Sequence, residues 1–378
     1  MAEPLRTDTV PFSSAVPVSG LYVVGRPMHG NKLIPSVPRL CIDELDDRID
    51  SLLVSSESVG SNHRAIRCDD LLQNFEMGDI VWLDGRSKRI RTLLSRKSSA
   101  NTLLVTERCE NRCIFCSQPP NQKPDTQLYL RAALALLNFD TSGFVGISGG
   151  EPTYNERSFR HLLRTLQQFE NKTRLHILSN GRRFADLSFA EDVAKLLDGR
   201  EVLWGIPLYG HRRISHNKLV AADGAFEQTI QGLINLGETG QVIELRIIPT
   251  QSNIENLSNI VTFVVSQFPH IRIISIMNIE PKGWARKNFH QVYVPVAAQN
   301  AFLTAAIDVA ESSGCDVRLF NYPLCLLSCE LHKFSRKSIS DWKNYFPGTC
   351  DGCRLRTACG GFFTSADGQF IEKLEAVL

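Results

Sequence analysis

Three cysteines, Cys109, Cys113 and Cys116, lie within one short loop, TERCENRCIFCSQPP, and no fourth cysteine stands beside them. A structural zinc site is closed by four ligands, commonly supplied as two C-x2-C pairs. Iron–sulfur clusters also take cysteine thiolates and normally use four. A loop that offers three thiolates leaves one metal position open, where a substrate or cosubstrate can bind. The spacing therefore predicts a reactive metal centre.

A second group of cysteines lies near the end of the chain. Cys350, Cys353 and Cys359 form C-x2-C-x5-C, a compact half site that one upstream cysteine would complete. Cys325 and Cys329 are the two candidates for that fourth ligand. Four thiolates suit either zinc or a second iron–sulfur cluster, and ligand type alone does not choose between them.

The elements that position these cysteines follow an alternating pattern from about residue 102 onward. Short β-branched apolar runs are separated by longer amphipathic ones, which is typical of βα units and a parallel sheet. We expect six strands, five intervening helices and a further helix near 295–313. Such a chain most readily forms a partial (β/α)6 barrel with right-handed crossovers. The expected strands span residues 101–107, 143–149, 174–180, 201–209, 241–249 and 271–279.

Special segments follow five of these strands. The cysteine loop follows the first, GGEPT the second, SNG the third, PLYGH the fourth and PTQSN the fifth. Because the carboxyl ends of parallel strands meet at one rim, we expect all five segments to lie together there. Gly149 and Gly150 would let backbone approach a ligand closely, and Glu151 would accept from an ammonium group. Ser179 and Asn180 offer a hydroxyl and an amide to a ribose.

The cysteine loop, with aromatic Phe115 just before the third cysteine, and the following GGEPT resemble the radical S-adenosylmethionine (radical SAM) superfamily. The resemblance implies that Cys109, Cys113 and Cys116 hold a 4Fe-4S cluster whose open iron binds S-adenosylmethionine (SAM). It implies that Phe115 lies near the adenine and that GGE contacts the methionine amino group. The cluster then cleaves SAM to a 5'-deoxyadenosyl radical, which abstracts hydrogen from the substrate.

The tail and the segment NIEPKGWARKN resemble one branch of that superfamily, the radical SAM maturase of the His-Xaa-Ser system (its C protein). That branch shows a PLC cysteine, SISDWKN, and C-x2-C-x5-C followed by GGFF. The resemblance implies a second 4Fe-4S cluster on Cys325, Cys350, Cys353 and Cys359, with Cys329 spare. It also implies a precursor peptide substrate, a second radical SAM maturase, and an electron donor such as flavodoxin or ferredoxin.

Composition describes an ordinary soluble protein of 378 residues, with 43% hydrophobic residues and a net charge of +2. It favours neither nucleic acid nor membrane as a partner. The N-terminus lacks the basic and apolar regions of a secretory signal, so we expect a cytoplasmic protein. We expect a small β-rich domain over 1–98, a radical SAM core over 99–314 and an auxiliary cluster domain over 315–378.

Two other functions compete with peptide maturation. The first is a radical SAM enzyme that acts on another protein or on a small metabolite. The second is a metal-stabilised module that binds a peptide for a partner and has no chemistry of its own. The three-cysteine loop and Glu151 argue against the second, because a scaffold needs neither an open iron nor an amino-acid clamp.

Overall fold

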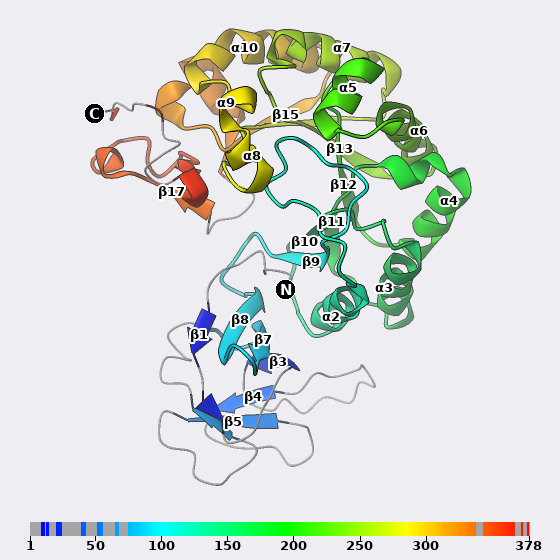
Figure 1. Ribbon diagram of the computed structural model, residues 1–378, viewed down its shortest axis with the longest axis vertical. Helices are drawn as coiled ribbons and strands as arrows, with labels where there is room; N and C mark the ends of the chain where they lie inside the picture. Colours follow the sequence, from blue (N-terminus) through cyan, green and yellow to red (C-terminus); the bar gives the residue numbers. More distant parts are fainter. Residues whose placement is uncertain are drawn as a thin grey trace.

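The computed structural model describes residues 75–337, 343–366, 372 and 376–377, together with six short strands before residue 75. Of those early strands, only Gly20–Val24 is also described in its side chains. The chain forms a curved core sheet wrapped by helices, with a separate sheet built from the N-terminal region (Figure 1).

The core sheet has eight parallel strands in the order β16-β15-β14-β13-β12-β11-β10-β9. The predicted α/β fold with parallel strands is confirmed, and all six expected strands are present. Two more strands continue the sheet beyond residue 314, in the region where we expected a separate auxiliary cluster domain. The strands are β9 (Thr102–Thr106), β10 (Phe144–Gly149), β11 (Arg174–Leu178), β12 (Val202–Pro207), β13 (Val242–Ile247), β14 (Ile273–Met277), β15 (Asp316–Phe320) and β16 (Ser335–Arg336).

The helices lie along the outer face of this curved sheet (Figure 1). The six expected helices are present as α2 (Thr126–Leu137), α3 (Glu156–Gln168), α4 (Leu187–Leu196), α6 (Ala225–Glu238), α7 (Leu257–Gln267) and α10 (Val296–Ser312). Three shorter helices were not expected from the sequence: α5 (Arg213–Val220), α8 (Gly283–Lys287) and α9 (Phe289–Val292). α5 follows β12 and α8 follows β14, with α9 directly after α8, and α5 and α8 contact the cysteine loop.

The two faces of the sheet differ in chemistry because side chains alternate along each strand. Residues facing the helices are apolar and fully buried, as Ile147, Trp204 and Leu245 are. The opposite, inner face carries small and polar residues, including Glu244 and Ser275. The sheet therefore combines a hydrophobic core on its outside with a polar lining on its inside.

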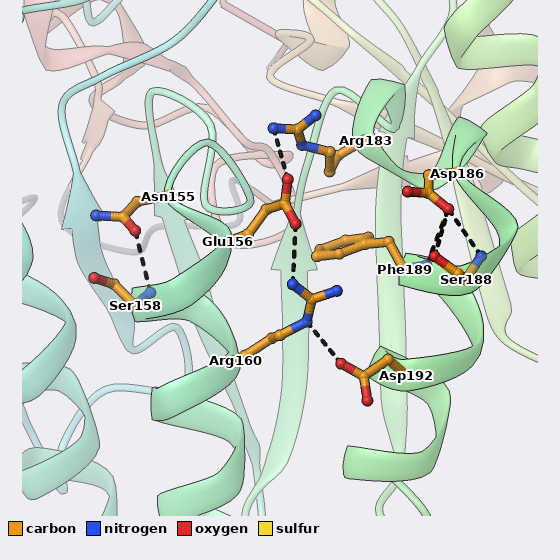
Figure 2. A network of polar contacts seen from close by, with 9 residues as sticks. All are labelled: Asn155, Glu156, Ser158, Arg160, Arg183, Asp186, Ser188, Phe189 and Asp192. Atoms are coloured by element: carbon orange, nitrogen blue, oxygen red, sulfur yellow. Dashed lines mark hydrogen bonds and ion pairs between the residues drawn. The ribbon is translucent and has the colours of Figure 1, made fainter.

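A polar network fastens α3 to α4 on the outside of the core (Figure 2). The Arg160 guanidinium bonds Glu156 Oε2 at 3.0 Å and Asp192 Oδ2 at 2.7 Å, and lies 4.7 Å over the Phe189 ring. Arg183, which follows β11, reaches the other Glu156 oxygen at 2.7 Å. These contacts are partly exposed, and exposed ion pairs each contribute little. Their shared geometry fixes the helix layer behind β10 and β11.

The N-terminal region forms a β-rich sheet, as predicted, in the order β1-β8-β7-β3-β4-β5-β6-β2. Leu21, Ile80 and Leu94 of this sheet join the same buried cluster as the core domain. The strands are β1 (Thr9–Pro11), β2 (Ser13–Ser14), β3 (Gly20–Val24), β4 (Arg39–Ile42), β5 (Ser51–Ser55), β6 (Ala65–Arg67), β7 (Ile80–Asp84) and β8 (Arg89–Leu94).

One helical stretch in the described residues, Phe289–Ser312, has the length and apolar composition that a membrane span needs. A core helix passes the same test, and the α10 part of this stretch packs on the sheet. Leu303, Ala306 and Ile307 are buried in the hydrophobic core. We assign α10 to that core.

Candidate functional site

The cysteine loop and the GGEPT turn are joined by backbone hydrogen bonds at the rim of the sheet. Gly150 N donates to Thr106 O at 3.0 Å, and Glu151 N donates to Arg108 O at 2.7 Å. β9 and β10 are neighbours in the sheet, so the turn that follows β10 lies directly beside the loop that follows β9. The position of Cys109 is therefore set by the turn that carries Glu151.

Gly149 and Gly150 make this contact sterically feasible. A Cβ on Gly149 would lie 2.3 Å from Thr106 O, and one on Gly150 would lie 2.3 Å from Arg108 O. Both clashes involve backbone atoms, which cannot turn away as a side chain can. The chain itself occupies the space that a Cβ would need at both positions. That the backbone of Gly149 and Gly150 also approaches a ligand stays a prediction.

Gly150→Ala is therefore expected to push the cysteine loop away from β10 and to reduce iron bound at the loop by more than half. Gly143→Ala is the matched control, because the nearest atom to a Cβ there is Thr141 Oγ1 at 3.5 Å. Iron content after anaerobic reconstitution measures the effect. Equal iron in the two variants would show that the loop tolerates displacement.

The Glu151 carboxylate is a fully buried hub between the ends of β10 and β11. Its Oε1 accepts from Thr153 N at 2.9 Å, from Thr153 Oγ1 at 2.6 Å and from Ser179 Oγ at 2.8 Å. Its Oε2 accepts from Asn180 N at 2.6 Å. Burial, and then the negative charge of Glu110, raise the pKa of Glu151 to about 7. A nearby cation such as an ammonium would stabilise its ionised form.

Asn180 extends this hub toward the cysteine loop. Its side-chain Nδ2 donates to Glu110 Oε1 at 3.1 Å, while its Oδ1 accepts from Arg182 N at 3.0 Å. Arg182 in turn donates to Asn111 Oδ1 at 2.5 Å. The structure thus brings together Glu151, Ser179 and Asn180 with the loop residues between the first two cysteines.

Burial governs the three cysteines of the loop. It raises the pKa of the Cys113 thiol to about 12, and the neighbouring Cys116 adds to the effect. Burial also raises the pKa of Cys109, to which the charges of Glu151, Glu110 and Cys113 contribute. The pKa of Cys116 is raised by burial as well. Thiolates at these positions need a positive partner, which a metal centre supplies.

Phe115 lies in a small hydrophobic cluster beneath the loop. Its ring meets the Tyr209 ring edge-on, with centroids 4.8 Å apart and planes at 84°. Cys113 and Leu219 belong to the same cluster. Phe115 thus anchors the loop to the segment after β12, and its ring is buried against Tyr209.

Helix α5, which the sequence reading missed, supports the cysteine loop from behind. Its end accepts two backbone hydrogen bonds from the loop, Arg112 N to Val220 O at 2.9 Å and Ile114 N to Leu219 O at 3.1 Å. The segment RISHNKLV has no strong apolar repeat, so periodicity did not reveal it. The signal available in the sequence was the PLYGH turn that precedes the helix. In the structure, a Cβ on Gly210 would lie 2.2 Å from Ser215 Oγ, so α5 packs closely against this glycine.

The EPKGW segment supports the other end of the loop. Trp284 N, at the start of α8, donates to Cys116 O at 2.8 Å. A Cβ on Gly283 would lie 2.6 Å from Ser117 O, and this glycine has a positive φ of 57°. Glu280 Oε2 in the same segment bonds Lys343 Nζ at 2.8 Å, in the tail. The segment therefore contacts both cysteine-bearing parts of the chain.

Of the five cysteines after residue 320, four lie close together. Burial, and then the charges of Cys359, Cys350 and Cys353, raise the pKa of Cys325 to about 11. The Cys359 sulfur accepts from Leu324 N and from Gly361 N, each at 3.3 Å. Such donors stabilise a thiolate.

Cys329, the other candidate for the fourth ligand in the tail, is exposed. Cys359, Cys350 and Cys353 contribute to the pKa of Cys325. The structure therefore groups Cys325 with the C-x2-C-x5-C cysteines. Among the described residues, no three His, Cys, Asp or Glu side chains are arranged to hold a single metal ion.

A polar cluster lies on the inner face of the sheet, centred on Glu244, which is 2% exposed. His176 Nε2 lies 2.7 Å from Glu244 Oε2, and Ser275 Oγ donates to the other oxygen. Arg246 Nη2 lies 2.8 Å from the Met277 sulfur. A Cβ on Gly205 would lie 3.2 Å from His176 Nε2, so this glycine makes room for the cluster. Sequence reading did not single out Glu244.

Glu244→Gln is expected to destabilise the protein by about 3 kcal/mol at pH 7. Burial alone raises the pKa of Glu244, but the hydrogen bond from His176 and the charge of Arg246 outweigh it and lower the pKa to about 2. A depressed pKa contributes stability that is complete above the ordinary value of 4.5 and is lost as pH falls toward 2.

Urea denaturation at pH 7 and at pH 3.5 measures this difference in the free energy of unfolding. The gap between wild type and variant should narrow at the lower pH. Glu191→Gln, on the exposed face of α4, is the control and should have little effect at either pH. A gap that does not change with pH would contradict the assigned ionisation.

Fold and site together define a class: a parallel α/β protein whose three-cysteine loop and buried glutamate meet at the carboxyl rim of its sheet. Residues 103–261 match the family model of the radical SAM superfamily, so this part of the chain is similar to that superfamily. No curated protein matches the chain.

Two solved structures are similar to this chain, and the first supports the fold. The structure of anSMEcpe with bound AdoMet and a peptide is 14% identical, with a TM-score of 0.51 over 73% of this chain and 91% of that one. SuiB of Streptococcus suis bound to S-adenosylmethionine is 17% identical, with a TM-score of 0.44 over 58% of this chain. The match spans about half of SuiB, 49% of its length.

Proposed function

We propose that this protein is a radical SAM enzyme that modifies a ribosomally made peptide in the cytoplasm. The observation that carries the proposal is the junction of the three-cysteine loop with the GGEPT turn, which places three thiols and a buried carboxylate at one rim. When bound, the cluster would supply the electron that cleaves SAM and generates a 5'-deoxyadenosyl radical.

The residues present suit that cofactor. Cys109, Cys113 and Cys116 are close enough to influence one another's ionisation, and each is held as a thiol by burial in the absence of a positive partner. Glu151 would bind the methionine ammonium, because a cation stabilises a carboxylate whose pKa is raised to about 7. Ser179 and Asn180 would keep Glu151 oriented, and their remaining polar atoms would face the ribose.

A second 4Fe-4S cluster on Cys325, Cys350, Cys353 and Cys359 is the matching proposal for the tail. The two N–H donors to the Cys359 sulfur support it, because hydrogen bonds to sulfur are among the ways in which a protein tunes such clusters. We propose that residues 315–378 serve as this auxiliary module and 99–314 as the radical SAM core. Residues 1–98 would form an accessory domain.

The peptide assignment rests on the tail and on the EPKGW segment, which the His-Xaa-Ser branch shares. We propose a precursor peptide with His-Xaa-Ser repeats as the substrate, a second radical SAM maturase as partner, and flavodoxin or ferredoxin as electron donor. The anSMEcpe structure contains a bound peptide, which is in keeping with a peptide substrate on this fold.

Anaerobic reconstitution with iron and sulfide, followed by dithionite and SAM, tests the core proposal. We expect about eight irons per chain, as two 4Fe-4S clusters require, and release of 5'-deoxyadenosine. Mass spectrometry of a co-expressed His-Xaa-Ser peptide then tests the substrate. About four irons with zinc in the tail would contradict the second cluster, and absence of 5'-deoxyadenosine would contradict the enzyme assignment.

A further inference from the structure

Tyr209, the residue after Leu208 in PLYGH, is held on all sides except at its hydroxyl. Its ring packs edge-on against Phe115 and stacks on His216 with centroids 6.0 Å apart and planes at 16°. Its backbone N–H donates to His216 Nδ1 at 3.2 Å, and its carbonyl accepts from Asn253 Nδ2 at 3.0 Å. Ring and backbone are therefore fixed relative to the cysteine loop.

Other buried tyrosines use their hydroxyls within the chain. Tyr129 donates to Pro152 O at 2.8 Å, and Tyr322 donates to Gln299 Oε1 at 2.9 Å. Tyr209 as a whole residue is only 8% exposed. Within the described part of the chain its contacts are made by the ring and the backbone, and none of them involves the hydroxyl. A phenylalanine would pack equally well between Phe115 and His216, so packing alone does not explain the hydroxyl.

The Tyr209 side chain lies close to the three loop cysteines. Burial raises the pKa of Tyr209, the charges of Cys113, Cys116 and Cys109 raise it further, and Arg246 opposes them. Cys113 also packs in the same hydrophobic cluster as the Tyr209 ring. Phe115 precedes Cys116 in the chain and its ring meets the Tyr209 ring at 4.8 Å, so the Tyr209 side chain lies beside the cysteine loop.

We propose that the Tyr209 hydroxyl donates a hydrogen bond to a sulfur atom of the iron–sulfur centre held by Cys109, Cys113 and Cys116. This inference rests on the proposed function. A donor aimed at a cluster sulfur stabilises the more negative, reduced form, so it raises the reduction potential. Tyr209 would thereby set how readily the electron donor reduces the cluster, and the stack on His216 would hold the phenol in place.

Tyr209→Phe tests the proposal in the full-length reconstituted protein. The measurement is an anaerobic redox titration followed by electron paramagnetic resonance, restricted to the signal that changes on addition of SAM. At the wild-type midpoint potential, the variant's cluster should be less than half reduced, with iron content and SAM affinity unchanged. Tyr322→Phe is the matched control, because it removes a buried hydroxyl that is bonded to Gln299.

Two outcomes would overturn the proposal. One is an unchanged midpoint potential with unchanged SAM affinity. The other is an unchanged potential with weaker SAM binding, which would assign the hydroxyl to the cosubstrate. Should the variant not fold, electron paramagnetic resonance of the wild-type protein in H2O and in D2O still tests the proposal. A cluster signal without any strongly coupled exchangeable proton would show that the cluster receives no such hydrogen bond. A wild-type chain that binds no iron at the loop would instead refute the proposed function itself.

Discussion

Cys113→Ala is expected to lower bound iron from about eight to about four atoms per chain and to abolish SAM cleavage. Cys113 is the middle cysteine of the loop and packs with Phe115 and Tyr209, so no other thiol can take its place. With two thiolates left, the proposed cluster would lack one of its three protein ligands. Iron analysis and chromatography of 5'-deoxyadenosine measure the two effects.

Cys329→Ala is the control for that experiment. Cys329 is exposed and lies outside the group formed by the other tail cysteines, so its replacement should leave both iron and cleavage at the wild-type level. Loss of iron on Cys329→Ala would reassign the tail ligands. Full cleavage activity in Cys113→Ala would remove the radical SAM mechanism and favour a peptide-binding scaffold.

Glu151→Gln is expected to weaken SAM binding by at least roughly tenfold, equivalent to about 1.4 kcal/mol, and to lower the stability of the ligand-free protein. A glutamine amide has one oxygen, whereas the carboxylate accepts from Thr153, Ser179 and Asn180 with two. An amide N–H would face at least one donor, and a buried donor without an acceptor costs about 1–3 kcal/mol. The lost negative charge would also remove the proposed partner of the methionine ammonium.

Thermal unfolding and a SAM titration separate the two contributions of Glu151. Glu238→Gln, on the exposed end of α6, is the matched control and should change neither quantity. A variant that melts earlier but binds SAM normally would confine Glu151 to holding the rim together. Normal thermal stability with loss of SAM binding would show that Thr153, Ser179 and Asn180 find other hydrogen-bond acceptors in the variant.

The sequence was sufficient to predict those parts of the fold that depend on local pattern. The six expected strands of the core are long, apolar runs, and the loop cysteines follow directly after one of them. β15 was missed because charged residues alternate with apolar ones in DVRLF. Helix α5 was missed for a similar reason, since its apolar residues do not form a clear stripe.

Contacts between distant segments could not be read from the sequence. Glu244 and His176 are 68 residues apart, and they come within 2.7 Å only because β13 and β11 lie on either side of β12 in the sheet. The sequence indicated that the glycines of GGEPT allow a close approach. It could not show that the backbone of Arg108, in a different segment, is one of the groups that approaches. Tyr209 likewise acquires meaning only beside Phe115 and His216.

The continuation of the core sheet into the tail affects how this protein can be dissected. β15 pairs with β14 over five residues, and β16 then pairs with β15. A recombinant fragment that stops at residue 314 would leave β14 as a bare edge, open to pairing with other copies. Such a fragment should aggregate, and its inactivity would say nothing about the auxiliary cysteines. Point substitutions in the intact chain are the sound way to separate the two cysteine groups.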